Sequence, residues 1–105
     1  MDELKKYEDL SEIAKAIAHP VRLYIINFLK EQSCCYTGKL TENLPFSQGT
    51  ISQHLKVLKD AGLIKGQIET PKIKYCLDAK RWKHAESLFT ELFKDFIERE
   101  LCETN

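Results

Sequence analysis

Apolar residues recur along this chain at two different spacings, and the change of spacing divides it into predicted elements. Up to about residue 61, and again after residue 78, they return every three or four positions, which is typical of helices with one buried face. Between these segments they alternate with polar residues, which indicates strands. The predicted helices are Asp2–Ala18, Pro20–Gln32, Tyr36–Asn43, Ser47–Ala61 and Ala79–Leu101, and a two-stranded hairpin joins Leu63–Glu69 to Lys72–Asp78.

Local signals support these boundaries. Pro20 disfavours helical backbone at His19 and is itself tolerated in a first helical turn, so one helix ends and the next begins there. Ser47 is a good N-cap, and Gly62 can adopt left-handed backbone after a helix. Helices three and four, with a short turn between them and a hairpin after them, predict a helix–turn–helix with a β "wing". We therefore expect a mainly α, winged helix–turn–helix fold with five helices, in a single domain spanning residues 1–105.

The fourth predicted helix has two contrasting sides. Its apolar residues, Ile51, Leu55 and Leu58, fall on one side, and His54 falls at the edge of that side, where we expect it half-buried and hydrogen-bonded to a neighbour. The opposite side is small, polar and basic, which suits a helix in the major groove of DNA. The residues predicted to contact DNA are Ser47, Gln48, Gly49, Thr50, Ser52, Gln53 and Lys56, with Lys72 on the hairpin.

Charge is unevenly distributed, although the formal net charge is +0. Residues 47–83 hold eight basic and three acidic side chains, a net charge of +5, while residues 1–46 carry −1 and residues 84–105 carry −4. A basic middle region suits a polyanionic partner such as DNA. A solvated basic surface with no partner is the alternative on charge alone, and the capped helix and the hairpin favour DNA.

Three stretches, LSEIAKAIAHPVRLYIINFL, SQGTISQHLKVLKDAGLIKG and KYCLD, resemble the ArsR/SmtB-type family of winged-helix repressors. The resemblance implies a homodimer that binds double-stranded operator DNA, represses a small stress-response operon and is released by an inducer, usually a metal ion or metalloid. It also implies that Ser47–Ala61 is the recognition helix and that the first and last helices form the dimer interface.

The apolar stripe of the last predicted helix agrees with a dimer. It carries Trp82, Phe89, Phe93 and Phe96, which is a large aromatic surface for a chain of 105 residues to cover alone. The alternative is that this stripe belongs to the core of one chain.

The cysteines are the candidates for an inducer site, and they are Cys34, Cys35, Cys76 and Cys102. No apolar run is long enough to span a membrane and no export signal is recognisable, so we expect a cytoplasmic protein with reduced thiols. Thiolates suit soft ions such as As(III), Sb(III), Cu(I) and zinc, and no other cofactor is expected. Adjacent thiolates of Cys34 and Cys35, with a third from Cys76 or Cys102, would bind a trigonal metalloid such as arsenite.

The geometry of such a site departs from the family pattern. Arsenic-responsive relatives carry a Cys-x-Cys pair in the third helix, at positions that correspond here to Tyr36 and Gly38. Cys76 alternates with Tyr75 and Leu77, so we expect it to face away from the apolar side of the hairpin.

Two further interpretations of the cysteines stay open. Oxidation could join Cys34 or Cys35 to Cys76 or Cys102, which would make the protein a redox or reactive-sulfur sensor. Alternatively, the cysteines could be small loop residues of a regulator that senses nothing.

Other sites and other classes of protein have weaker signals. A zinc site on the last helix would use His84, Asp95 and Glu98, which is a poor zinc set. We expect no enzyme, because no nucleophile with its base can be assembled and no glycine-rich phosphate loop is present. A pure protein–protein module would explain the aromatic last helix but not the polar side of the fourth helix.

Overall fold

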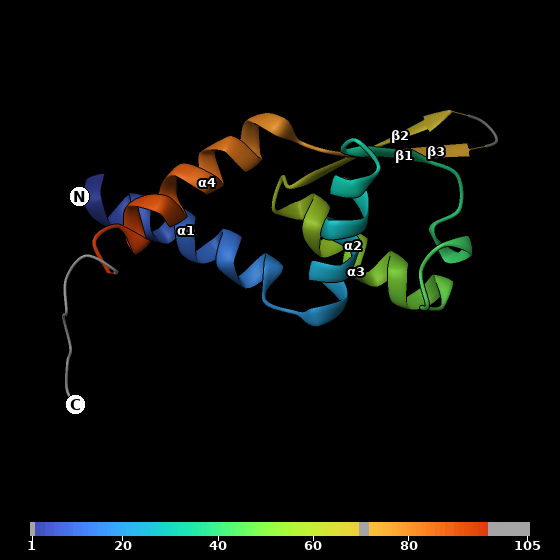
Figure 1. Ribbon diagram of the computed structural model, residues 1–105, viewed down its shortest axis with the longest axis horizontal. Helices are drawn as coiled ribbons and strands as arrows, with labels where there is room; N and C mark the ends of the chain where they lie inside the picture. Colours follow the sequence, from blue (N-terminus) through green and yellow to red (C-terminus); the bar gives the residue numbers. More distant parts are fainter. Residues whose placement is uncertain (1, 70–71, 97–105) are drawn as a thin grey trace.

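The computed structural model describes residues 2–69 and 72–96, which form a mainly helical, winged helix–turn–helix fold (Figure 1). In chain order the elements are α1 (Asp2–Ile17), α2 (Pro20–Glu31), β1 (Cys35–Thr37), the 3₁₀ helix η1 (Leu40–Glu42), α3 (Gln48–Asp60), β2 (Ile64–Glu69), β3 (Lys72–Leu77) and α4 (Ala79–Phe93). The sheet lies at one end of the molecule, and α1 and α4 lie side by side at the other (Figure 1).

One hydrophobic core connects the helices to the sheet. Each α-helix contributes buried apolar side chains from a single face, as the helical spacing predicted. The largest fully buried side chains are those of Ile13, Ile25, Leu29, Ile51, Leu58 and Leu63. Because α3 supplies two of them, its orientation is fixed by the core and its opposite side remains available to a partner.

Side chains cap the helix ends, and the caps predicted at Ser47 and Gly62 are confirmed, while a cap at His19 was not predicted. The His19 ring accepts a hydrogen bond from the Val21 amide at 3.1 Å, directly before Pro20 at the start of α2. The Ser47 hydroxyl accepts from the Thr50 amide at 3.3 Å and begins α3. Gly62 follows α3 with a φ of +77°, in the left-handed region that favours glycine.

The hairpin is confirmed, and it forms part of a larger sheet. β2 and β3 (together the wing) pair antiparallel, with Ile64 opposite Leu77 and Glu69 opposite Lys72. β1 adds a third strand on the other side of β3, so that the strand order is β1-β3-β2. The side chains of residues 67–73 are not described, and neither is the backbone of residues 70–71.

The predicted third helix, Tyr36–Asn43, is wrong. Its first residues lie in β1, because the edge of β3 offers backbone partners and β-branched and aromatic residues suit a strand. Gly38 has a φ of +127°, which ends the strand and is incompatible with a helix. The remaining residues form only the short η1, so the described residues contain four α-helices rather than five.

The last helix is shorter than the predicted Ala79–Leu101. α4 begins after its N-cap Asp78, whose carboxylate accepts from the Arg81 amide at 3.0 Å, and it ends at Phe93. A turn follows, in which Asp95 has a φ of +71°. Residues 97–101 of the prediction lie outside the described residues. No helix among those described is long and apolar enough to cross a membrane.

Candidate nucleic-acid interface

The outward side of α3 is open to solvent and polar. Apart from Thr50, the residues predicted there are exposed: Ser47, Gln48, Gly49, Ser52, Gln53 and Lys56. A side chain added at Gly49 would meet no atom within 4 Å, so a partner's backbone or phosphates could approach closely there. This exposed row has the size and the hydrogen-bonding groups that a major-groove helix needs.

Three residues of this side have partners within the chain. The Gln48 side chain donates to the Ser52 hydroxyl at 2.8 Å, which holds both groups in one orientation. Lys56 forms an ion pair with Asp60 one turn later, at 3.2 Å, and both side chains are well exposed. Exposed pairs of this kind are weak, so Lys56 remains available to a phosphate.

Thr50 has a structural task as well. It is half-buried, and its hydroxyl accepts from Ser47 at 3.0 Å while its amide donates to the same residue. Thr50 therefore supports the start of α3, and this contact could be expected from its position three residues after the N-cap.

The segment before α3 supports that helix through buried leucines. Leu40 and Leu44, in and after η1, are buried against the core that holds Ile51 and Leu55. The predicted turn between helices three and four thus keeps its supporting role, although η1 replaces most of the helix before it.

His54 lies where the sequence predicted, half-buried and hydrogen-bonded. Arg22 donates to its Nδ1 at 3.2 Å, and the His19 ring lies 4.3 Å from the His54 ring, centroid to centroid. Burial, followed by the charges of His19 and Arg22, lowers the pKa of His54. This group links the start of α2 to the middle of α3, and sequence analysis missed it because its members are distant along the chain.

The wing adds basic groups beside α3. Lys72 pairs with Glu69 in the strand register directly before the wing's turn, and the placement of its side chain lies outside the described residues. Lys59 and Lys65 are exposed, and Lys74 is half-buried. These three lysines were not singled out from the sequence, although the +5 charge of residues 47–83 includes them.

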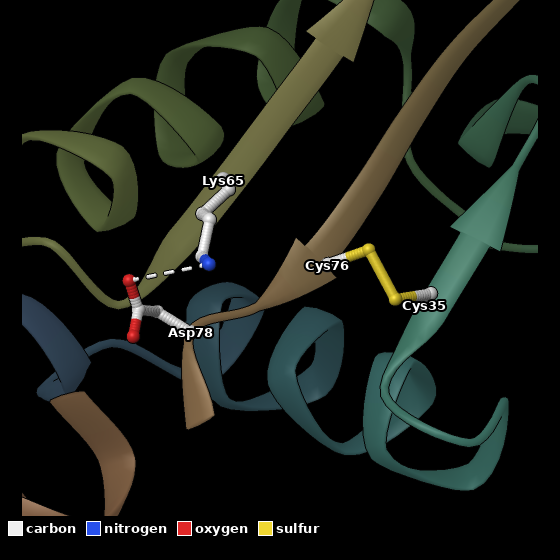
Figure 2. The surroundings of a disulfide bond; sticks show 4 residues. All are labelled: Cys35, Lys65, Cys76 and Asp78. Atoms are coloured by element: carbon white, nitrogen blue, oxygen red, sulfur yellow. Dashed lines mark ion pairs between the residues drawn. A yellow bond between two sulfur atoms is a disulfide. The ribbon is translucent and has the colours of Figure 1, made fainter. Parts of the chain in front are cut away.

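The expectation of four reduced thiols is corrected by the structure. Cys35 and Cys76 form a disulfide between β1 and β3, where the two residues are direct partners in the register and their Cα atoms lie 4.1 Å apart (Figure 2). The third strand brings them together, and sequence analysis placed Cys35 in a loop. Cys76 faces away from Tyr75 and Leu77, which pack on the core, so that prediction is confirmed.

The adjacent cysteines face different surroundings. Cys34 is exposed and, among the described residues, unpaired. It lines a cavity of about 380 Å³ between α2 and α4, together with Trp82 and Phe89. Cys102 lies outside the described residues. Within the part of the chain that the structure describes, no group of three potential metal ligands is assembled.

Among the described residues, the weak zinc set considered on the last helix is not assembled either. Nε2 of His84 lies 2.6 Å from an Asp9 carboxylate oxygen, and Arg81 donates to both oxygens of that carboxylate. Hydrogen bonds from Arg81 and then His84 lower the pKa of Asp9. His84 thus connects α1 to α4, while Asp95 lies in the turn after α4 and Glu98 lies outside the described residues.

The recognition helix, the turn before it and the wing define a regulator of the winged helix–turn–helix class. Residues 19–65 match the family model described as "Bacterial regulatory protein, arsR family". An HTH-type transcriptional regulator of Methanocaldococcus jannaschii is 37% identical over 89 residues, which is 85% of this chain and 100% of that protein. The chain belongs to the ArsR/SmtB family of transcriptional regulators.

Other comparisons agree with this assignment. The biofilm growth-associated repressor of Xylella fastidiosa is 30% identical over 85% of this chain and 78% of that protein. The crystal structure of the transcriptional repressor BigR from Xylella fastidiosa matches with a TM-score of 0.66 and 29% identity, over 86% of this chain and 92% of that one. An ArsR-like regulator from Rhodococcus sp. RHA1 shares the fold, with a TM-score of 0.70 at 20% identity over 89% and 87% of the two chains.

Proposed function

We propose that this chain is a sequence-specific repressor that binds double-stranded operator DNA as a homodimer in the cytoplasm. The observation that carries the proposal is the exposed polar side of α3, held outward by Ile51, Leu55 and Leu58. Gln48, Ser52 and Gln53 would read base edges, while Lys56 and the wing, with Lys72, would contact phosphates. Ser47, Gly49 and Thr50 would place the start of α3 against the DNA backbone.

A second copy of the chain would cover the far end of the molecule. Trp82 packs within its own chain, where its ring nitrogen donates to the Leu63 carbonyl at 2.8 Å, and Phe89 also packs on the core. Large apolar side chains of α1, α4 and the following turn are nevertheless 45–60% exposed: Leu4, Tyr7, Leu92, Phe93 and Phe96. Such a patch favours a symmetric interface, which would present two recognition helices to two half-sites.

We further propose that a thiol-directed inducer releases the repressor from DNA. In the first candidate mechanism, the inducer is arsenite, which Cys34 and Cys35 would bind with Cys76 or Cys102 as the third ligand. Reduction of the bridge would present the Cys35 and Cys76 thiolates beside each other on adjacent strands, with Cys34 next in the chain. The disulfide itself supports the second candidate, a redox or reactive-sulfur sensor that uses the same cysteines.

A binding titration on the DNA upstream of this protein's own gene tests the proposal. We expect the protein to bind detectably both with the bridge intact and after reduction, and its affinity to fall steeply with added salt. Arsenite should release the wild type but not the Cys34→Ser and Cys35→Ser variants. Binding unaffected by arsenite, oxidant or thiol would identify a regulator that does not sense through its cysteines, and no salt-dependent binding under any condition would contradict the proposed function.

A further inference from the structure

The Cys35–Cys76 disulfide encloses every element that we assign to DNA contact. Residues 35–76, called here the DNA-reading loop, contain β1, η1, α3, β2 and nearly all of β3. By contrast, α1, α2 and α4 lie outside this segment of the chain, although α2 packs against both α3 and the sheet (Figure 1). A single covalent bond therefore joins the two ends of the DNA-reading loop, which also packs on α1 and α2 through the hydrophobic core.

The backbone directly before Cys35 is strained. Ser33 and Cys34 have φ values of +61° and +74°, which non-glycine residues rarely adopt, and here two occur in succession. Two hydrogen bonds restrain them: the Cys34 amide donates to the Leu29 carbonyl, and the Leu77 amide donates to the Cys34 carbonyl, both at 2.8 Å. The disulfide at Cys35 is the next restraint along the chain, so opening it gives this strained turn a way to relax.

A lysine lies on the same side of the sheet as the bridge. Lys65 is the direct partner of Cys76 in the β2–β3 register, so Lys65 and Cys35 flank Cys76 from its two neighbouring strands (Figure 2). Asp78 forms an ion pair with Lys65, at 3.9 Å, which restrains the ammonium at this end of the strand. Neither cysteine residue is fully buried.

We infer that the Cys35–Cys76 bridge is a thiol–disulfide exchange site for low-molecular-weight thiols, that Lys65 promotes the exchange, and that opening the bridge weakens DNA binding. The last part rests on the proposed function, whereas the exchange chemistry does not. The positive charge of Lys65 stabilises a departing Cys76 thiolate and favours attack at Cys35. Lys74, two residues before Cys76 on the same side of β3, adds to the positive charge that an anionic thiol would meet.

The exchange is balanced with two equivalents of thiol. A thiolate attacks the Cys35 sulfur, the bond between the two cysteines breaks, and its electron pair leaves on the Cys76 sulfur, which takes up a proton. A second thiolate attacks the small-molecule sulfur of this mixed disulfide and releases Cys35, which is protonated in turn. The small thiol is oxidised to its disulfide, and the two cysteines are reduced.

The first experiment measures exchange without DNA. The disulfide form is treated with 2-mercaptoethanesulfonate, which is anionic, or with 2-mercaptoethanol, which is neutral, and the rates are expressed per thiolate. We expect Lys65→Gln to slow exchange with the sulfonate roughly threefold. Lys65→Arg should restore the rate, and Lys5→Gln, an exposed lysine of α1 at the other end of the molecule, should leave it unchanged. Equal rates for the wild type and Lys65→Gln would overturn the role of Lys65.

The second experiment measures affinity for the upstream DNA before and after the same treatment. We expect opening of the bridge to weaken binding by about fivefold or more, and reoxidation to restore it. Cys34→Ser, which keeps the bridge, should behave as the wild type, and the Cys35→Ser/Cys76→Ser double variant should bind like the reduced protein under all conditions. Equal affinity of both states would overturn the switch. Binding in neither state would refute the proposed function, while the exchange rates would still decide the chemistry at the bridge.

Discussion

On α3, the large apolar side chains are buried or half-buried, whereas on α1 and α4 several of them face solvent. Both regions use amphipathic helices, so the helical spacing of apolar residues alone does not distinguish them. What differs is the character of the exposed side: small, polar and basic on α3, aromatic and aliphatic near Phe93 and Leu4. The first suits a charged polymer and the second suits another copy of the chain.

The two regions share one hydrophobic core but differ in the links that reinforce it. The DNA-reading loop is closed by a covalent bridge between β1 and β3. The α1–α4 end is connected by ion pairs, including Lys6 with Glu91 at 2.6 Å and Asp9 with Arg81 at 3.0 Å, whose side chains are partly or well exposed. Redox conditions should therefore act on the DNA-reading loop, and salt on the contacts at the other end.

Reduction of the disulfide should have the largest effect on stability. The bridge joins residues 41 apart, and closing a loop of that size restricts the unfolded chain by about 4 kcal/mol in the chain-entropy model. We expect urea unfolding with a dithiol present to show a free energy of unfolding lower by about that amount. Cys34→Ser should not change the difference between oxidised and reduced protein. Equal urea midpoints in both states would show that the bridge does not constrain the chain.

Substitution at the α1–α4 end should separate dimerisation from folding. Phe93 is 60% exposed, so Phe93→Glu should keep the fold of the chain while placing a charge in the proposed interface. We expect the dimer to weaken about a hundredfold, as found for central interface residues, measured by sedimentation equilibrium. Glu86→Gln, on the exposed surface of the same helix, is the matched control. A Phe93→Glu protein that dimerises like the wild type would move the interface elsewhere.

Substitutions on α3 should act on DNA binding alone. Gln53→Ala and Lys56→Ala remove exposed groups that contact nothing buried, so the free energy of unfolding should change little. We expect each to weaken operator binding roughly tenfold. Lys56→Ala should also reduce the salt dependence, because it removes one phosphate contact, whereas Gln53→Ala should relax discrimination between sequences. Normal binding by both variants would mean that another side of α3 faces DNA.

The sequence predicted the parts of the fold that depend on local chemistry. The caps at Ser47 and Gly62, the break at Pro20 and the alternating wing are set by residues near one another in the chain, and all are present. The contacts of the recognition side with DNA stay a prediction, because the exposed groups are in place but no partner tests them.

Long-range pairing is what the sequence did not reveal. β1 exists because β3, forty residues later, offers an unpaired edge, and the Cys35–Cys76 bridge depends on that pairing. A three-residue strand carries too little periodicity to be recognised from its own residues. The Asp9–Arg81–His84 contacts are hidden for the same reason, since they join the first helix to the last.

Acidification should have the smallest effect, through the contact between α2 and α3. The pKa of His54 is lowered from the usual value of 6.5 in the folded chain, so the unfolded chain binds more protons as the pH falls below that value. The free energy of unfolding should therefore decrease as the pH drops from 6.5 to the lowered pKa of His54. Below that pKa, His54 is protonated in both the folded and the unfolded chain, so it causes no further decrease. The pH dependence of urea unfolding should show this loss in the wild type but not in His54→Gln, which cannot titrate. Both proteins are to be compared above pH 4.5. Asp9, whose pKa is lowered from 3.8, causes a separate loss of stability, but only at more acidic pH. Parallel curves for the two proteins would mean that neither burial nor the charges of His19 and Arg22 oppose protonation of His54, and that the α2–α3 contact is insensitive to pH.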